Sequence, residues 1–183
     1  MGRLSVPAPR PAALLLDANV LIDFWLADRT VLPIISAGIA PLRIPLPVLR
    51  EEVDPAATED WLSLGVVSVE PATELVARAG VRRPGLSFHD RICLLLAKEN
   101  GWTCVTNDRR LRRDCDKERV PVRWGLELVI ECVRGGLLSA GAAESIGRAL
   151  RSASPTFFTQ AIFDEFRAAI SGTPAARSPR KRR

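Results

Sequence analysis

The feature that most constrains the fold of this chain is the alternation of short apolar runs with helical segments. The runs 12–16, 43–46, 66–69, 102–106 and 120–124 have the length of β-strands and are rich in Leu, Val and Ile. Segments with helical spacing of apolar residues separate them. This order is typical of right-handed βαβ units. We therefore expect an α/β fold, a three-layer α/β/α sandwich around a central parallel sheet of about five strands.

Local signals support individual helices. Ser87 is placed to cap a helix over 87–100, Asp90 stands at the capping-box position, and Gly101 follows the predicted end. Beyond residue 125 the pattern becomes helical, with segments 126–133, 140–150 and 158–170. We expect these C-terminal helices to pack on the same domain.

The length of 183 residues fits one domain. We expect a disordered segment over 1–11, a domain over 12–171 with a helical extension from about 125, and a disordered basic tail over 172–183. Five tail residues, Arg177, Arg180, Lys181, Arg182 and Arg183, match the whole formal net charge of +5. The net charge therefore says little about partners, and a solvated tail is favoured over an RNA-binding one.

Some classes of protein and site are disfavoured by what the sequence contains. No apolar run is long enough to cross a bilayer, and 12–16 is too short for a signal-peptide core, so we expect a soluble cytoplasmic protein without a membrane role. The four cysteines are widely spaced and form no zinc or redox motif, which favours reduced thiols. They are Cys93, Cys104, Cys115 and Cys132.

Four carboxylates stand where a parallel sheet presents its ligand-binding edge. Asp17 and Asp108 follow predicted strands, Asp90 lies in the first turn of a helix, and Glu51 lies early in the helix after the second strand. Each aspartate alone has a structural interpretation as a helix cap. Together, however, four carboxylates in one crevice repel one another unless a cation is bound. We therefore predict a metal site.

Oxygen ligands without Cys or a His pair suit Mg²⁺ or Mn²⁺ better than Zn²⁺. The chemistry that such a site favours is phosphodiester hydrolysis by a metal-activated water. Arg109, next to Asp108, is a candidate contact to a substrate phosphate. We predict that His89 is an incidental surface or capping residue, and that the four dispersed tryptophans pack in the core and form no base-stacking platform.

Four blocks together resemble the PIN-domain family. They are LLLDANVLIDF (14–24), PVLREEV (47–53), LSFHDRICLLLAKENG (86–101) and VTNDRRLR (105–112). The later WGLELVIECVRGGLLSAGAAES (124–145) is similar to the C-terminal extension of a PIN branch found among prokaryotic toxin–antitoxin pairs.

This resemblance implies a Rossmann-like fold and a Mg²⁺- or Mn²⁺-dependent endoribonuclease. The family's catalytic acids match Asp17, Glu51, Asp90 and Asp108, and the metal is expected on the three aspartates. The family's polar positions match Asn19, Thr106 and Asn107, which we expect to contact substrate. Because neighbouring side chains on a helix point about 100° apart, only one of Glu51 and Glu52 can face the crevice, and we favour Glu51. An antitoxin partner and a homodimer are implied by the resemblance alone.

Other functions fit less well. The phosphatase pattern requires a second aspartate two positions after the first, where this chain has Asn19. The chain contains no phosphate-binding P-loop and no dinucleotide-binding glycine motif. The remaining alternative is a catalytically inactive PIN-like module that binds protein or RNA.

Overall fold

The computed structural model describes residues 10–53, 61–81, 85–155 and 157–172. The expected disordered ends lie almost entirely outside these residues. The strands are β1 (Leu14–Leu16), β2 (Leu42–Pro45), β3 (Val66–Val69), β4 (Thr103–Val105) and β5 (Val122–Arg123). The helices are α1 (Ala18–Asp28), α2 (Val31–Gly38), α3 (Leu46–Glu51), α4 (Thr73–Gly80), α5 (Phe88–Asn100), α6 (Arg109–Lys117), α7 (Gly125–Arg134), α8 (Ala140–Ala153) and α9 (Gln160–Ser171).

The strands form one sheet in the order β3-β2-β1-β4-β5, and every neighbouring pair is parallel. Strand β1 is central, because Leu14 pairs with Leu42 on one side and Leu16 pairs with Val105 on the other. All three residues of β1 are fully buried. The expected α/β sandwich with a five-stranded parallel sheet is therefore confirmed.

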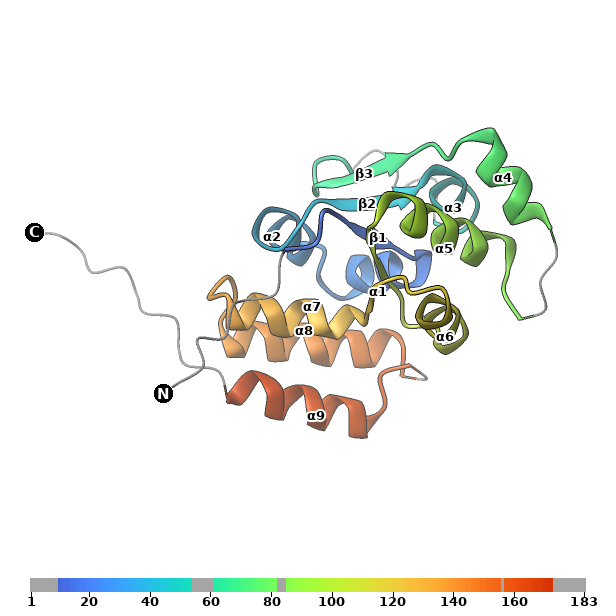
Figure 1. Ribbon diagram of the computed structural model, residues 1–183. Coiled ribbons are helices and arrows are strands. Elements are labelled where there is room, and N and C mark those ends of the chain that lie inside the picture. Colours follow the sequence, from blue (N-terminus) through green and yellow to red (C-terminus); the bar gives the residue numbers. More distant parts are fainter. Residues whose placement is uncertain (1–9, 54–60, 82–84, 156, 173–183) are drawn as a thin grey trace, which may run out of the picture.

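Helices cover both faces of the sheet (Figure 1). Helix α5 packs on β1, β2 and β4 on one face, with α4 and α6 beside it. Helices α1 and α2 lie on the other face, and α7, α8 and α9 pack outside them. Since all strands run in the same direction, the segments that follow β1, β4 and β5 emerge at one edge of the sheet. Both cavities described below open at this edge.

The predicted helix α5 is confirmed together with its cap. The Ser87 hydroxyl accepts a hydrogen bond from the Asp90 backbone N–H, and the Asp90 carboxylate accepts one from the Ser87 backbone N–H. Gly101 ends the helix with φ of 64°, a left-handed conformation that suits glycine. Helix α2 was not predicted. It is apolar almost throughout and carries Pro33, which lies in its first turn and so breaks no helical hydrogen bond.

The C-terminal helices belong to the same packed body. Helix α8 lies against α1, and α9 packs on α7 and α8. The α8–α9 contact is close at Gly147, where a Cβ atom would lie 2.5 Å from a ring carbon of Phe166. All four cysteines are buried and free. Among the described residues, no helix is long and apolar enough to cross a membrane.

Candidate active site

Asp17 lies at the carboxyl end of the central strand. Its backbone N–H donates to the Val105 carbonyl at 3.0 Å, which extends the β1–β4 pairing to the site. Its side chain is only 3% exposed. The Thr106 hydroxyl donates to Asp17 Oδ2 at 2.8 Å. The carboxylate is therefore fixed by the neighbouring strand.

Asp108 is positioned by the same threonine. Its backbone N–H donates to Thr106 Oγ1 at 3.0 Å, so this hydroxyl links Asp17 to the start of α6. Asp108 Oδ1 accepts hydrogen bonds from the backbone N–H groups of Arg110 at 2.6 Å and Leu111 at 2.9 Å. Asp108 is thus a true N-cap. Its Oδ2 has no hydrogen bond from the described residues.

Asp90 has a comparable arrangement on α5. Its Oδ2 accepts from the Ser87 N–H at 2.8 Å, and its Oδ1 has no hydrogen bond from the described residues. The structural interpretation of Asp90 and Asp108 as helix-capping residues is therefore correct. It does not compete with a chemical role, because one oxygen of each carboxylate performs the capping.

These aspartates surround one crevice with a volume of about 400 Å³. The residues that line it come from the segments after β1 and β4, from the starts of α1 and α5, and from the end of α3. They are Asp17, Ala18, Asn19, Ile22, Glu52, Ser87, Asp90 and Asp108. The structure thus brings together Asp17, Asp90, Asp108 and the exposed Asn19. Their roles in metal and substrate binding stay predictions.

The glutamate of the crevice is Glu52, and the preference for Glu51 was wrong on this point. Glu51 is the last residue of α3, its side chain is 60% exposed, and it does not line the crevice. Glu52 follows as the C-cap residue, so the chain has already left the regular helix there.

His89 holds both glutamates, which sequence reasoning missed. Its Nε2 lies 3.0 Å from Glu51 Oε2, and its Nδ1 lies 3.0 Å from Glu52 Oε1. The imidazole side chain is only 16% exposed. His89 therefore ties the end of α3 to the start of α5 and helps to position Glu52. The interpretation of His89 as incidental is not supported.

Two residues expected to contact substrate have internal roles. Thr106 is fully buried, and its hydroxyl joins Asp17 to Asp108. Asn107 is 5% exposed, and its amide donates to Asp23 Oδ2 at 3.0 Å and accepts from the Gly125 N–H at 3.2 Å. The Thr106 hydroxyl is fully buried and makes its hydrogen bonds inside the protein, so the expected substrate contact of Thr106 needs correction. Asn107 also lines the second cavity beside the crevice, so its contact with substrate stays a prediction.

The arginines near the acids separate into two groups. Arg91 is buried and donates to the backbone carbonyls of Ala79 and Leu86, which makes it a structural residue. Arg109 is exposed and lines a second cavity beside the crevice. It therefore stays a candidate for contact with a substrate phosphate.

The electrostatics of the crevice favour a bound cation. The pKa of Asp17 is raised from 3.8 to about 7, mainly by burial and also by the negative charges of Asp90 and Glu52, while the Thr106 hydrogen bond opposes the shift. Within the described residues, no three Asp, Glu, His or Cys side chains are already arranged to hold a metal ion. The donor set nevertheless fits Mg²⁺ or Mn²⁺, because Asp90 and Asp108 each have an uncapped oxygen and the charges of Asp90 and Glu52 disfavour the ionised form of Asp17.

Comparisons with known proteins identified no similar protein. Neither the protein-family models, nor the curated proteins, nor the solved structures that were searched include a match to this chain.

Proposed function

We propose that this protein is a divalent-metal-dependent endoribonuclease of the PIN type. The observation that carries the proposal is the convergence of Asp17, Asp90, Asp108 and Glu52 on one crevice at the carboxyl end of a parallel sheet. Ligand sites in open α/β sheets lie at this edge. The resemblance of the four sequence blocks to the PIN-domain family supports the choice of RNA as substrate.

Each residue has a distinct part in this proposal. Asp17, Asp90 and Asp108 would hold Mg²⁺ or Mn²⁺, which supplies an activated water and neutralises charge on the phosphate. Thr106 fixes Asp17 and Asp108 relative to each other. His89 fixes Glu52, which lines the crevice and in this proposal would help to orient the attacking water. Asn19 is exposed and lines the crevice, and in this proposal it would contact a phosphate oxygen.

The direct test is cleavage of single-stranded RNA by the full-length protein with Mg²⁺ or Mn²⁺. We expect cleavage that EDTA abolishes and that Asp17→Asn reduces by at least about 100-fold, because the variant loses a metal ligand at the centre of the site. Calorimetry with Mn²⁺ should show weaker binding to the same variant. Absence of both cleavage and metal binding across several RNAs would reject the proposal.

The two glutamates give a matched pair of variants. Glu52→Gln should lower kcat by about 10- to 100-fold, because Glu52 lines the crevice. Glu51→Gln removes the same charge one residue away and should change kcat by less than about twofold. Both variants keep a hydrogen-bonding group within reach of His89. A larger loss for Glu51→Gln would restore the assignment made from sequence.

The proposal extends to the biological setting. We infer a cytoplasmic toxin ribonuclease of a toxin–antitoxin pair, with an antitoxin as inhibitor and with a homodimer as a further partner. These inferences follow from the family resemblance. Co-expression with the protein encoded by the adjacent gene, followed by measurement of growth and of complex formation, tests the antitoxin directly.

A second candidate function is an inactive PIN-like module that binds RNA or protein. The observation in its favour is that no set of three ligands is already arranged around an ion among the described residues. The module predicts RNA binding without cleavage and without a change in thermal midpoint on addition of Mn²⁺.

A further inference from the structure

A second cavity opens beside the acidic crevice. Its volume is about 550 Å³, within the range of roughly 300–1,000 Å³ typical of small-molecule sites. Helices α7 and α9 form its walls, and the segments that follow β4 and β5 close one end. Because Asp108 lines the crevice and Arg109 lines this pocket, the two cavities lie on either side of the start of α6.

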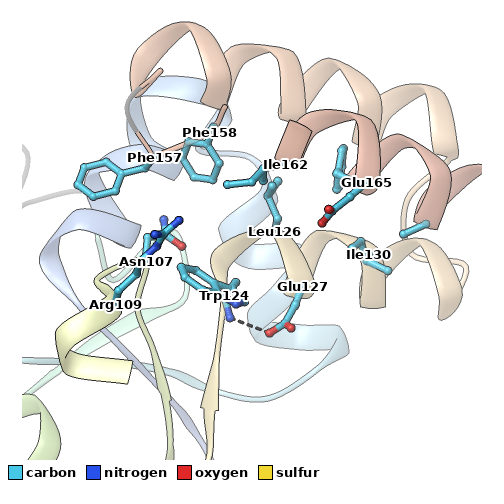
Figure 2. Close-up of a pocket in the computed structure, with 12 residues that line it drawn as sticks. Asn107, Arg109, Trp124, Leu126, Glu127, Ile130, Phe157, Phe158, Ile162 and Glu165 are labelled. Atoms are coloured by element: carbon cyan, nitrogen blue, oxygen red, sulfur yellow. Dashed lines mark hydrogen bonds between the residues drawn. The ribbon is translucent and has the colours of Figure 1, made fainter. Parts of the chain in front are cut away.

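The walls of the pocket suit a flat, apolar ring. Leu126 and Ile162 line its middle, and the Phe157 ring stands at its edge (Figure 2). Phe157 is 46% exposed, which is unusual for so large an apolar side chain. The neighbouring Trp124 is held in place by the Arg112 guanidinium, 3.9 Å from its ring centroid. The pocket therefore has an aromatic side chain, Phe157, that is only partly buried by the rest of the protein.

The two ends of the pocket differ in charge. Arg109 and Phe157 lie at one end and Glu165 lies at the other (Figure 2). Glu127 also lines the pocket, and it is fixed by the hydrogen bond that its carboxylate accepts from the Trp124 backbone N–H at 2.7 Å. A phosphate is attracted to the Arg109 end and repelled by the two carboxylates. An uncharged ring is not repelled and can occupy the interior.

We propose that this pocket binds an unstacked base of single-stranded RNA while a neighbouring phosphate lies at the acidic crevice. Phe157 stacks on the base, and Arg109 contacts the connecting phosphate. This inference rests on the proposed ribonuclease function and adds to it a preference for unpaired RNA. A paired base in a duplex is not free to enter such a pocket.

Binding to a fluorescein-labelled single-stranded RNA in EDTA, followed by anisotropy, tests the pocket without cleavage. The comparison probe is an oligonucleotide of equal length and charge in which every nucleotide is abasic. The full-length protein should bind the base-containing RNA about 5- to 10-fold more tightly than the abasic one. Phe157→Ala should remove most of this difference, and Phe157→Trp should retain it.

Two further variants separate stacking from charge and from general surface effects. Arg109→Gln should weaken binding of both oligonucleotides to a similar extent and lower the salt dependence. Leu26→Ala removes an apolar side chain that is 63% exposed and does not line the pocket, so it should bind like the unmodified protein.

The proposal is overturned if the unmodified protein binds both oligonucleotides equally, or if Phe157→Ala leaves their difference intact. A change of oligomeric state in Phe157→Ala with unchanged RNA affinity would also overturn it and would assign the pocket to a second copy of the chain. If metal-dependent cleavage is observed together with either of these results, the ribonuclease proposal is supported and the base-pocket proposal is rejected. If binding depends on the bases and on Phe157 but no cleavage is observed, the base-pocket proposal is supported and the ribonuclease proposal is rejected.

Discussion

Asp17→Asn should make the metal-free protein more stable than the unmodified chain at about pH 8, by about 2–4 kcal/mol. Burial and the charges of Asp90 and Glu52 raise the pKa of Asp17 to about 7 from an ordinary value of 3.8. The folded state therefore holds a proton that the unfolded state releases from about pH 4 upward. The stability of the unmodified protein should fall as the pH rises from about 4 to 7, and asparagine cannot ionise.

Urea unfolding in EDTA at several pH values measures this effect. The stabilisation by Asp17→Asn should be nearly absent at about pH 4 and complete above about pH 7. Addition of Mn²⁺ at about pH 8 should then raise the unfolding midpoint of the unmodified protein and leave that of the variant nearly unchanged. A pH-independent difference between the two proteins would show that charge on Asp17 is not the cause.

Asn107→Ala should destabilise the fold by about 2–4 kcal/mol. The substitution leaves the Gly125 N–H without its acceptor and removes a donor from Asp23, which is 6% exposed. Burial already raises the pKa of Asp23, and the hydrogen bonds from Asn107 and Ser154 oppose the shift. The same amide therefore supports the contact between the sheet and the C-terminal helices.

Urea unfolding distinguishes this structural role from the substrate contact predicted from sequence. Asn19→Ala is the matched control, because it removes an exposed amide and should change stability by less than about 0.5 kcal/mol. The structural role predicts a large loss of stability for Asn107→Ala alone. An unchanged stability with a raised KM would instead support the substrate contact.

The strands and the cap of α5 were predictable because their signals are local. Val66–Val69 is bounded as expected, and Ser87 and Asp90 form the predicted capping box. Helix α2 escaped prediction because an almost uniformly apolar segment has no polar face to reveal its period.

The errors in the candidate site have a different cause. The choice between Glu51 and Glu52 assumed a regular helix, but α3 ends at Glu51 and Glu52 is placed by the chain beyond it. The partners of Thr106 and Asn107 are Asp17 and Asp23, which lie 89 and 84 residues away in the chain. Sequence spacing gives no geometry for such contacts, because they depend on how the strands and helices pack.

The capping bonds of Asp90 and Asp108 have a consequence for ion selectivity. Each carboxylate uses one oxygen for a helix terminus, and only its other oxygen is free of hydrogen bonds from the described residues. Ca²⁺ prefers six to eight oxygens, often including both oxygens of one carboxylate, whereas Mg²⁺ retains several of its own waters. The hydrogen bonds that begin two helices therefore also disfavour the larger ion, and Ca²⁺ should compete poorly with Mg²⁺ in this crevice.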